Sequence, residues 1–137
     1  MRFDHVPART VRFWAWLDSS VTWTLAIPPF AAGFLRLLYR INGWLGGESA
    51  PPAFGSIQLF FVCLSGVLIS LWVVVRLVYP SGQLAFADAI GRAFVAVLIA
   101  YFLIFTDAPR VLALFVFTEL AGTVGQLAAV LRRPPPA

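Results

Sequence analysis

The sequence lacks lysine altogether, has one cysteine and one histidine, and is only 12% charged over 137 residues. The lone cysteine, Cys63, excludes a disulfide within the chain, and one cysteine with one histidine cannot supply the repeated ligand spacing of a zinc site. His5 stands near the N-terminus, where we expect a solvated side chain at a membrane interface. We therefore expect neither a metal nor a cofactor.

Motifs that carry enzyme chemistry or nucleic-acid binding are also absent. The sequence has no Ser/His/Asp set, no His-Glu-x-x-His motif and no phosphate-binding loop. The ten basic residues are all arginine, and they form no run with interleaved aromatics in a soluble segment. We expect no nucleic-acid partner and assign no catalytic residue.

Apolar residues dominate what is present. The chain is 61% hydrophobic, and its charged fraction is about half of the roughly 25% that is usual in a soluble domain. So few polar residues cannot cover the surface of a soluble protein, and the expected solvent is lipid. Residues 1–137 leave no room for a separate soluble domain, which predicts a single transmembrane domain.

Four apolar segments are long enough to cross ~30 Å of hydrocarbon at ~1.5 Å per residue. They lie at about 13–33, 54–79, 83–106 and 110–131. The turns between the last three segments are short, so these segments should be antiparallel neighbours. Arg76 is expected to mark the interfacial end of the second span.

Residues 34–45 alternate apolar positions with Arg36, Arg40 and Asn42, a pattern that suits a short helix lying at the membrane interface. Pro28-Pro29 should kink or end the preceding helix, because proline removes backbone donors. The alternative is a first span that simply runs long and tilted. The predicted fold class is all-α: a four-helix transmembrane bundle with a short amphipathic interfacial helix after the first span.

The arginines also predict an orientation. Four spans place both termini on one side, and six arginines are assigned to that side against three on the other. The first group is Arg2, Arg9, Arg12, Arg76, Arg132 and Arg133, and the second is Arg36, Arg40 and Arg110. Because cytoplasmic loops carry the excess of basic residues, we expect both termini in the cytoplasm of a bacterium, with the chain in its inner membrane.

A small set of polar residues interrupts the apolar segments and forms the candidate site: Asp18, Asp88, Arg92, Glu119 and Gln126. Counting ~1.5 Å per residue from the cytoplasmic end places Asp18, Asp88 and Gln126 at roughly 8 Å depth. Arg92 falls at roughly 14 Å and Glu119 at roughly 18 Å, with a turn of error. Charges in hydrocarbon are costly, so their gathering at one level indicates either a built-in pairing or a function.

Helix spacing predicts how these residues meet. Asp88 and Arg92 are four residues apart and share a helix face, as do Glu119 and Gln126, which are seven apart. Turning both faces inward sets Arg92 between Asp88 and Glu119. Thr22 and Ser70 are counted at a depth similar to that of Arg92 and Glu119. Small residues, namely Gly91, Gly122 and Gly125, should let the third and fourth spans approach closely.

Several interpretations of this site remain open. The first is structural: Arg92 holds the last two spans in register through its carboxylate partners. The second is a polar pocket for the head of an amphipathic molecule, such as a lipid or a quinone-like ligand, in a non-enzymatic accessory subunit. The third is a small transporter that passes a proton through Glu119, and would need to form an oligomer. A lipid-modifying enzyme that uses paired carboxylates is a further alternative. Partners beyond the bilayer would be a second copy or a larger membrane complex.

The chain resembles the small DoxX-like and BphX-like bacterial membrane proteins. The resemblance rests on four spans, on Asp88, Gly91 and Arg92 at the entry to the third, and on a lone Glu119 in the fourth. It implies a four-helix membrane bundle with an accessory role. Pro28-Pro29 and the amphipathic segment depart from the family pattern, and the resemblance assigns no catalytic residue.

Overall fold

The computed structural model describes Phe3 and residues 5–132, and these residues fold into helices without any strand. The elements are α1 (Ala8–Leu25), α2 (Pro28–Trp44), α3 (Ser56–Val78), α4 (Gly82–Phe105) and α5 (Leu112–Leu131). The last three coincide within about two residues with the apolar segments at 54–79, 83–106 and 110–131. Each is long and apolar enough to cross a membrane. The prediction of an all-α protein is therefore confirmed.

The first predicted span is wrong in its limits. Helix α1 begins at Ala8, before residue 13, and ends at Leu25, well before residue 33. Pro28 and Pro29 occupy the first turn of α2, where a missing N–H costs no helical hydrogen bond, so they start a helix and do not merely end one. The helix predicted at 34–45 accordingly runs over 28–44.

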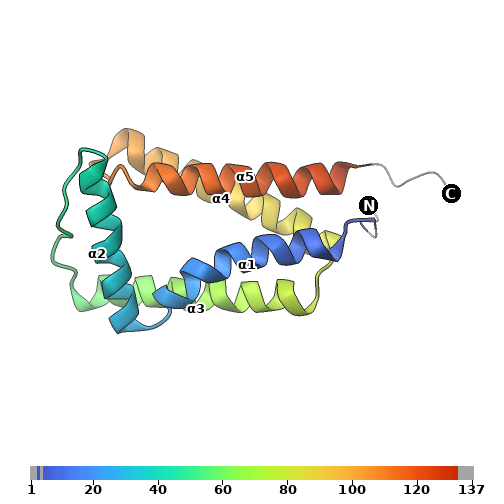
Figure 1. Cartoon of the computed structure of the whole chain (residues 1–137), viewed down its shortest axis with the longest axis horizontal. Coiled ribbons are helices and arrows are strands. Elements are labelled where there is room, and N and C mark those ends of the chain that lie inside the picture. Colours follow the sequence, from blue (N-terminus) through green and yellow to red (C-terminus); the bar gives the residue numbers. More distant parts are fainter. Residues whose placement is uncertain (1–2, 4, 133–137) are drawn as a thin grey trace.

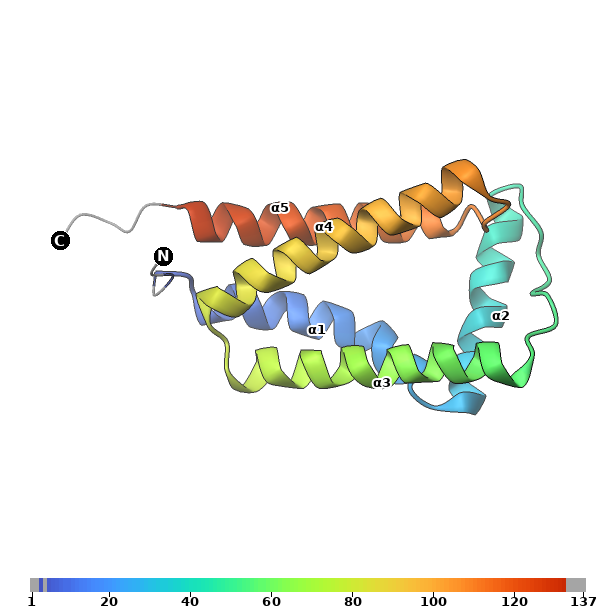
Figure 2. The same cartoon turned by 180° about the vertical axis from the view of Figure 1, so that it is seen from behind.

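Helices α1 and α2 meet at an angle of 109°. They satisfy the length and composition of a span only when taken together, as a broken span or a re-entrant loop. The bend excludes one long tilted helix, which was the alternative for this region. Helix α2 instead lies across one end of the molecule, roughly perpendicular to the other four helices (Figures 1 and 2).

The four long helices form two pairs. Helix α1 packs along α3, and α4 packs along α5, whereas contacts from α1 to α4 and α5 are sparse. A small apolar core of Val6, Val11, Ala85 and Val130 joins the two pairs at the end of the molecule where the described chain begins and ends. Away from this core the pairs diverge toward α2 (Figure 2).

One glycine explains how closely α1 and α3 approach. A Cβ at Gly66 of α3 would lie 2.5 Å from the backbone of Leu25 and Ala26. Only glycine therefore permits this contact. The end of α1 is fixed against the middle of α3.

The outer faces of the helices are strongly apolar. Phe94, Ile104, Phe105 and Phe117 are each exposed over 70% or more of their surface. A soluble monomer rarely exposes apolar side chains so extensively. Together with the length of α3, α4 and α5, these faces suit hydrocarbon as solvent.

Candidate functional site

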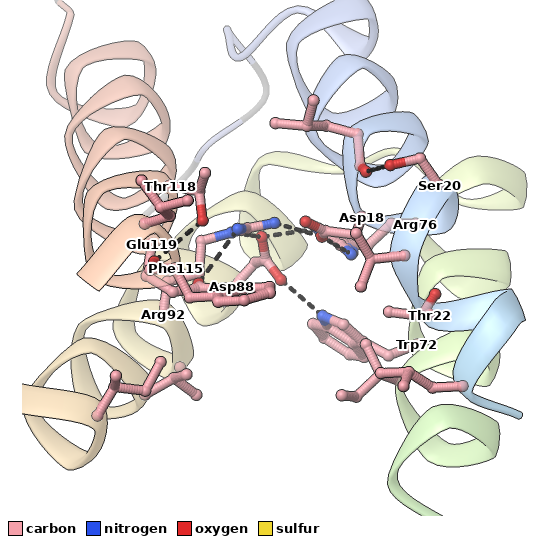
Figure 3. Close-up of a pocket in the computed structure, with 18 of the residues that line it drawn as sticks. Asp18, Ser20, Thr22, Trp72, Arg76, Asp88, Arg92, Phe115, Thr118 and Glu119 are labelled. Carbon is pink, nitrogen blue, oxygen red and sulfur yellow. Dashed lines mark hydrogen bonds and ion pairs between the residues drawn. The ribbon is translucent and has the colours of Figure 1, made fainter. Parts of the chain in front are cut away.

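The polar side chains inside the bundle form one connected group, which we call the polar cluster. It contains Asp18 of α1, Trp72 and Arg76 of α3, Asp88 and Arg92 of α4, and Glu119 and Gln126 of α5. All five predicted site residues are therefore brought together, with Trp72 and Arg76 in addition. The cluster lies where the two helix pairs face each other (Figure 3).

Asp88 is the centre of the cluster. Its Oδ2 accepts hydrogen bonds from Arg76 Nη1 at 2.7 Å, Arg92 Nε at 2.8 Å and Gln126 Nε2 at 2.5 Å. Its Oδ1 accepts one from Trp72 Nε1 at 2.7 Å. Four donors from three helices thus converge on one carboxylate that is only 6% exposed. A buried carboxylate needs such compensation, because leaving it unpaired costs several kcal/mol.

The two arginines share a second carboxylate, Asp18. Its Oδ2 accepts from Arg76 Nη2 at 2.6 Å and also pairs with Arg92 Nη2. Because Asp18 belongs to α1 and Asp88 to α4, each arginine joins one helix pair to the other. The planar guanidinium makes this bridging possible, since its donors point in several directions at once.

Glu119 stands at the edge of the cluster. Its Oε2 lies 3.2 Å from Arg92 Nη1, the longest ion pair of the set, and its side chain is 21% exposed. The Asp18 side chain is 17% exposed, whereas Arg76 is fully buried. Glu119 and Asp18 are therefore the most accessible of the three acids in the cluster.

Helix geometry sets each of these positions. Trp72 and Arg76 are four residues apart on α3, as are Asp88 and Arg92 on α4, so each pair shares a face. The arginines also lie over indole rings: Arg76 is 5.8 Å from the Trp72 ring centroid and Arg92 is 5.7 Å from that of Trp14. These contacts shield the guanidinium faces, as cation–π geometry allows.

Two of the three glycines predicted at the contact between α4 and α5 have other surroundings. A Cβ at Gly122 would lie 2.7 Å from Arg92 Cδ, so this glycine makes room for the arginine side chain. A Cβ at Gly125 would meet Trp14 of α1 at 2.6 Å, not α4, while Gly91 has nothing within 4 Å. Only Gly122 therefore serves the contact between α4 and α5.

Arg76 was missed because an arginine near the end of an apolar run is usually a marker of the interface. The structure corrects this, since Arg76 is completely buried and binds both Asp18 and Asp88. The depth of Arg76 was the available signal, because counting along the second span places it within about one helical turn of the depth of those two acids. With Arg76 included, three carboxylates face two arginines, a formal excess of one negative charge.

Other expectations near the cluster are met only in part. Thr22 Oγ1 and Ser70 Oγ are buried, as their depth suggested, but neither has a hydrogen-bond partner among the described residues. His5 is half-buried rather than solvated, and its Nε2 lies 2.9 Å from the carbonyl oxygen of Val130. Among the described residues, no group of three His, Cys, Asp or Glu is arranged to hold a metal ion.

A cavity of about 660 Å³ lies beside the polar cluster, between the two helix pairs. Its volume falls in the range of sites that enclose small molecules, ~300–1,000 Å³. Six members of the cluster lie at one part of its wall: Asp18, Trp72, Arg76, Asp88, Arg92 and Glu119. The rest of the wall is mainly apolar and includes Leu25, Leu38, Ile41, Ile69, Val95, Ile99, Val111, Leu114 and Phe115. The cavity is thus amphipathic.

Helix α2 closes the end of the cavity away from the cluster. Leu38 and Ile41 contribute to the wall, and the buried Asn42 fixes the helix in place. Asn42 Oδ1 accepts from the backbone N–H of Val111 at 3.0 Å, and its Nδ2 donates to the carbonyl of Glu48 at 2.9 Å. One side chain therefore ties α2 to the start of α5, across the gap between the pairs.

The chain matches no family model, no curated protein and no solved structure. The resemblance to DoxX-like and BphX-like proteins therefore stays a prediction. Geometry and charge are what bear on function.

Proposed function

We propose that this chain is a four-span protein of a bacterial inner membrane that binds the polar head of an amphipathic molecule in a non-enzymatic accessory role. The observation that carries the proposal is the cavity, which has charged groups at one part of its wall and apolar side chains over the rest. An amphipathic ligand matches both parts, because its head finds polar partners while its tail stays out of water. A lipid or a quinone-like molecule belongs to this class.

The polar cluster supports ligand binding, and it also supports the structural interpretation in which its ion pairs hold the helices in register. Four of its five ion pairs connect different helices among α1, α3, α4 and α5, so the same residues hold the helix pairs together and form the wall where the head would bind. Structural pairing and ligand binding are compatible here, because Asp88 is enclosed while Asp18 and Glu119 remain partly exposed.

The proposed orientation has both termini in the cytoplasm. The charge distribution supports it, with α1 and α2 counted as one broken span. It is tested by single cysteines in a Cys63→Ala background. Ala50→Cys, in the exposed loop before α3, should react with a membrane-impermeant maleimide in intact cells. Gln83→Cys, exposed at the start of α4, should react only after permeabilisation. The reverse labelling pattern would refute the orientation.

A cavity-filling substitution tests ligand binding. Gly91 lines the cavity and has nothing within 4 Å of an added Cβ, so Gly91→Leu should occupy the space without touching an ion pair. Gly33→Leu in α2 is the matched control, because Gly33 lies outside the cavity wall and its nearest neighbour is the end of Arg36 at 4.0 Å. Native mass spectrometry should show a bound molecule that Gly91→Leu loses and Gly33→Leu keeps. Equal occupancy in both variants would contradict the proposal.

A proton-coupled carrier is the second candidate, and the position of Glu119 favours it. This carboxylate lines the cavity with one ion-pair partner, so it is the acid best placed to exchange a proton with a substrate or with water. Four spans form a narrow path, and such a carrier should assemble with a second copy or a larger complex. A pH-driven flux in proteoliposomes that survives Glu119→Gln would exclude this mechanism.

A further inference from the structure

The free polar atoms at the charged part of the cavity are mostly acceptors. All three nitrogens of Arg92 and both terminal nitrogens of Arg76 already donate to carboxylates. Nε of Arg76 has no partner among the described residues, but that side chain is fully buried. By contrast, no hydrogen bond from the described residues reaches Oδ1 of Asp18 or Oε1 of Glu119. Both carboxylates are partly exposed and both line the cavity. A ligand therefore meets acceptors where it can form new hydrogen bonds.

These two carboxylates are neighbours. They bind the two terminal nitrogens of one guanidinium, Asp18 at Nη2 of Arg92 and Glu119 at Nη1. Figure 3 shows the two acids flanking that side chain, Asp18 from α1 and Glu119 from α5. The two carboxylates therefore lie at the same part of the cavity wall.

An independent observation indicates an unmet hydrogen-bonding group at this place. Thr22 lines the cavity one helical turn beyond Asp18 and is only 6% exposed. Its Oγ1 has no hydrogen-bond partner among the described residues. A buried hydroxyl without a partner costs about 1–3 kcal/mol, so such groups usually have a ligand or water to bind.

The formal charge of the cluster points the same way. Asp18, Asp88 and Glu119 outnumber Arg76 and Arg92 by one negative charge. An uncompensated charge inside a membrane protein is costly, and a bound cation would neutralise it.

We propose that the cavity takes an amphipathic amine, whose ammonium group binds beside Asp18 and Glu119 while its apolar tail extends toward α2. This assignment rests on the proposed function and names the ligand class for the same cavity. A primary ammonium group carries three N–H donors and one positive charge, which matches the free acceptors and the charge excess together. A quinone-like head offers only carbonyl acceptors and no positive charge, so it would leave the free carboxylate oxygens unpaired and the charge excess uncompensated.

Three probes with comparable tails separate these alternatives: dodecylamine, dodecanoate and a decyl-substituted benzoquinone. Dodecylamine is protonated at pH 7, because alkylamines titrate near 10. The full-length protein in a neutral maltoside detergent is titrated with each probe, and tryptophan fluorescence is followed. Trp72 lines the cavity, so Trp72→Phe identifies the part of the signal that comes from it.

We expect dodecylamine to bind at least tenfold more tightly than either other probe. Glu119→Gln keeps the side-chain shape and removes one negative charge, and it should weaken dodecylamine binding about tenfold while leaving benzoquinone binding unchanged. Equal or tighter binding of the quinone or of dodecanoate in the unmodified protein overturns the amine assignment but leaves a ligand-binding cavity. This comparison needs no variant, so it holds even if Glu119→Gln fails to fold.

Failure of the proposed function gives a different result from failure of the amine assignment alone. If no probe binds, or if Gly91→Leu binds all three as the unmodified protein does, the cavity is not a ligand site and both proposals fall.

The ammonium group has two sources, a free amine or the ethanolamine head of a phospholipid. Native mass spectrometry after reconstitution in vesicles with and without ethanolamine phospholipid tells them apart. Retention of that lipid, and its displacement by dodecylamine, identifies the phospholipid as the source.

Discussion

Arg76 Nη1 lies 2.7 Å from Asp88 Oδ2, and this ion pair joins α3 to α4 across the division between the two helix pairs. The two residues are only 12 positions apart, on either side of the turn at Pro80-Ser81. Helices α3 and α4 nevertheless share little packing. The ion pair therefore replaces the apolar contact that usually holds consecutive antiparallel helices together.

Replacing Arg76 should destabilise the protein strongly. Arg76→Ala leaves Asp18 and Asp88 with one fewer cation, and loss of one partner of a buried pair costs about 3–5 kcal/mol. For a domain of this size we expect the unfolding temperature in detergent to fall by roughly 10 °C or more. Arg40→Ala, on an exposed arginine of α2, is the control and should change it by at most a degree or two. Similar shifts in both variants would contradict a bridging role for Arg76.

Two glycine substitutions test how Arg92 is held. In Gly122→Ala the new Cβ would lie 2.7 Å from Arg92 Cδ, and the ion pairs prevent the side chain from moving away freely. We expect a loss of about 1–3 kcal/mol in stability, typical of overpacking.

Gly91→Ala is the matched control, because nothing lies within 4 Å of its Cβ. Alanine favours a helix over glycine by up to ~1 kcal/mol, so this variant should be neutral or more stable. Thermal unfolding of both variants in one detergent measures the contrast. Equal effects would show that Arg92 is not confined at Gly122.

The sequence predicted the polar cluster better than the path of its first helix. Asp18, Asp88, Arg92, Glu119 and Gln126 could be grouped because a charge inside an apolar segment stands out and helical rise converts its position into a depth. The prolines at 28 and 29 predicted a break next to residues 26–27, but the following helix was expected to begin only at residue 34, because the apolar pattern continues past the break. Only the proline pair signals the turn, and proline at a helix start resembles proline at a helix end.

The cavity could not be predicted in the same way. It depends on the two helix pairs diverging, and that follows from side-chain packing at Val11, Val130 and Gly66 rather than from any periodic pattern. Gly91 shows the difficulty, since a glycine in a predicted span suggests close helix contact and here it faces open space. Arg76 shows the converse, because rules of topology assign it to the interface.

A charge exchange within the cluster should fail to restore stability. In a simple pair, Arg92→Glu with Glu119→Arg would preserve the interaction. Here Arg92 also pairs with Asp88 and Asp18, so the exchange would place a third carboxylate beside those two. We expect the double variant to be no more stable than Arg92→Glu alone in thermal unfolding. Recovery of more than about half of the loss would mean that Glu119 is the dominant partner of Arg92.

The link between α2 and α5 gives the last prediction. Asn42→Ala removes the acceptor of the Val111 N–H, which is buried and would be left unpaired, at a cost of about 1–3 kcal/mol. Without this hydrogen bond, α2 loses its link to α5 and should detach before the other helices unfold. Since α2 contributes to the cavity wall, the cavity would open at that end. Hydrogen exchange should rise first in residues 28–44, with α3 and α4 unchanged. Arg36→Ala, on an exposed arginine of the same helix, is the control and should leave exchange in α2 as it was. If Asn42→Ala instead raises exchange uniformly across all five helices, α2 is part of one cooperative unit with the bundle. The α2 end of the cavity would then open only by global unfolding, and a ligand would have to enter between the helix pairs.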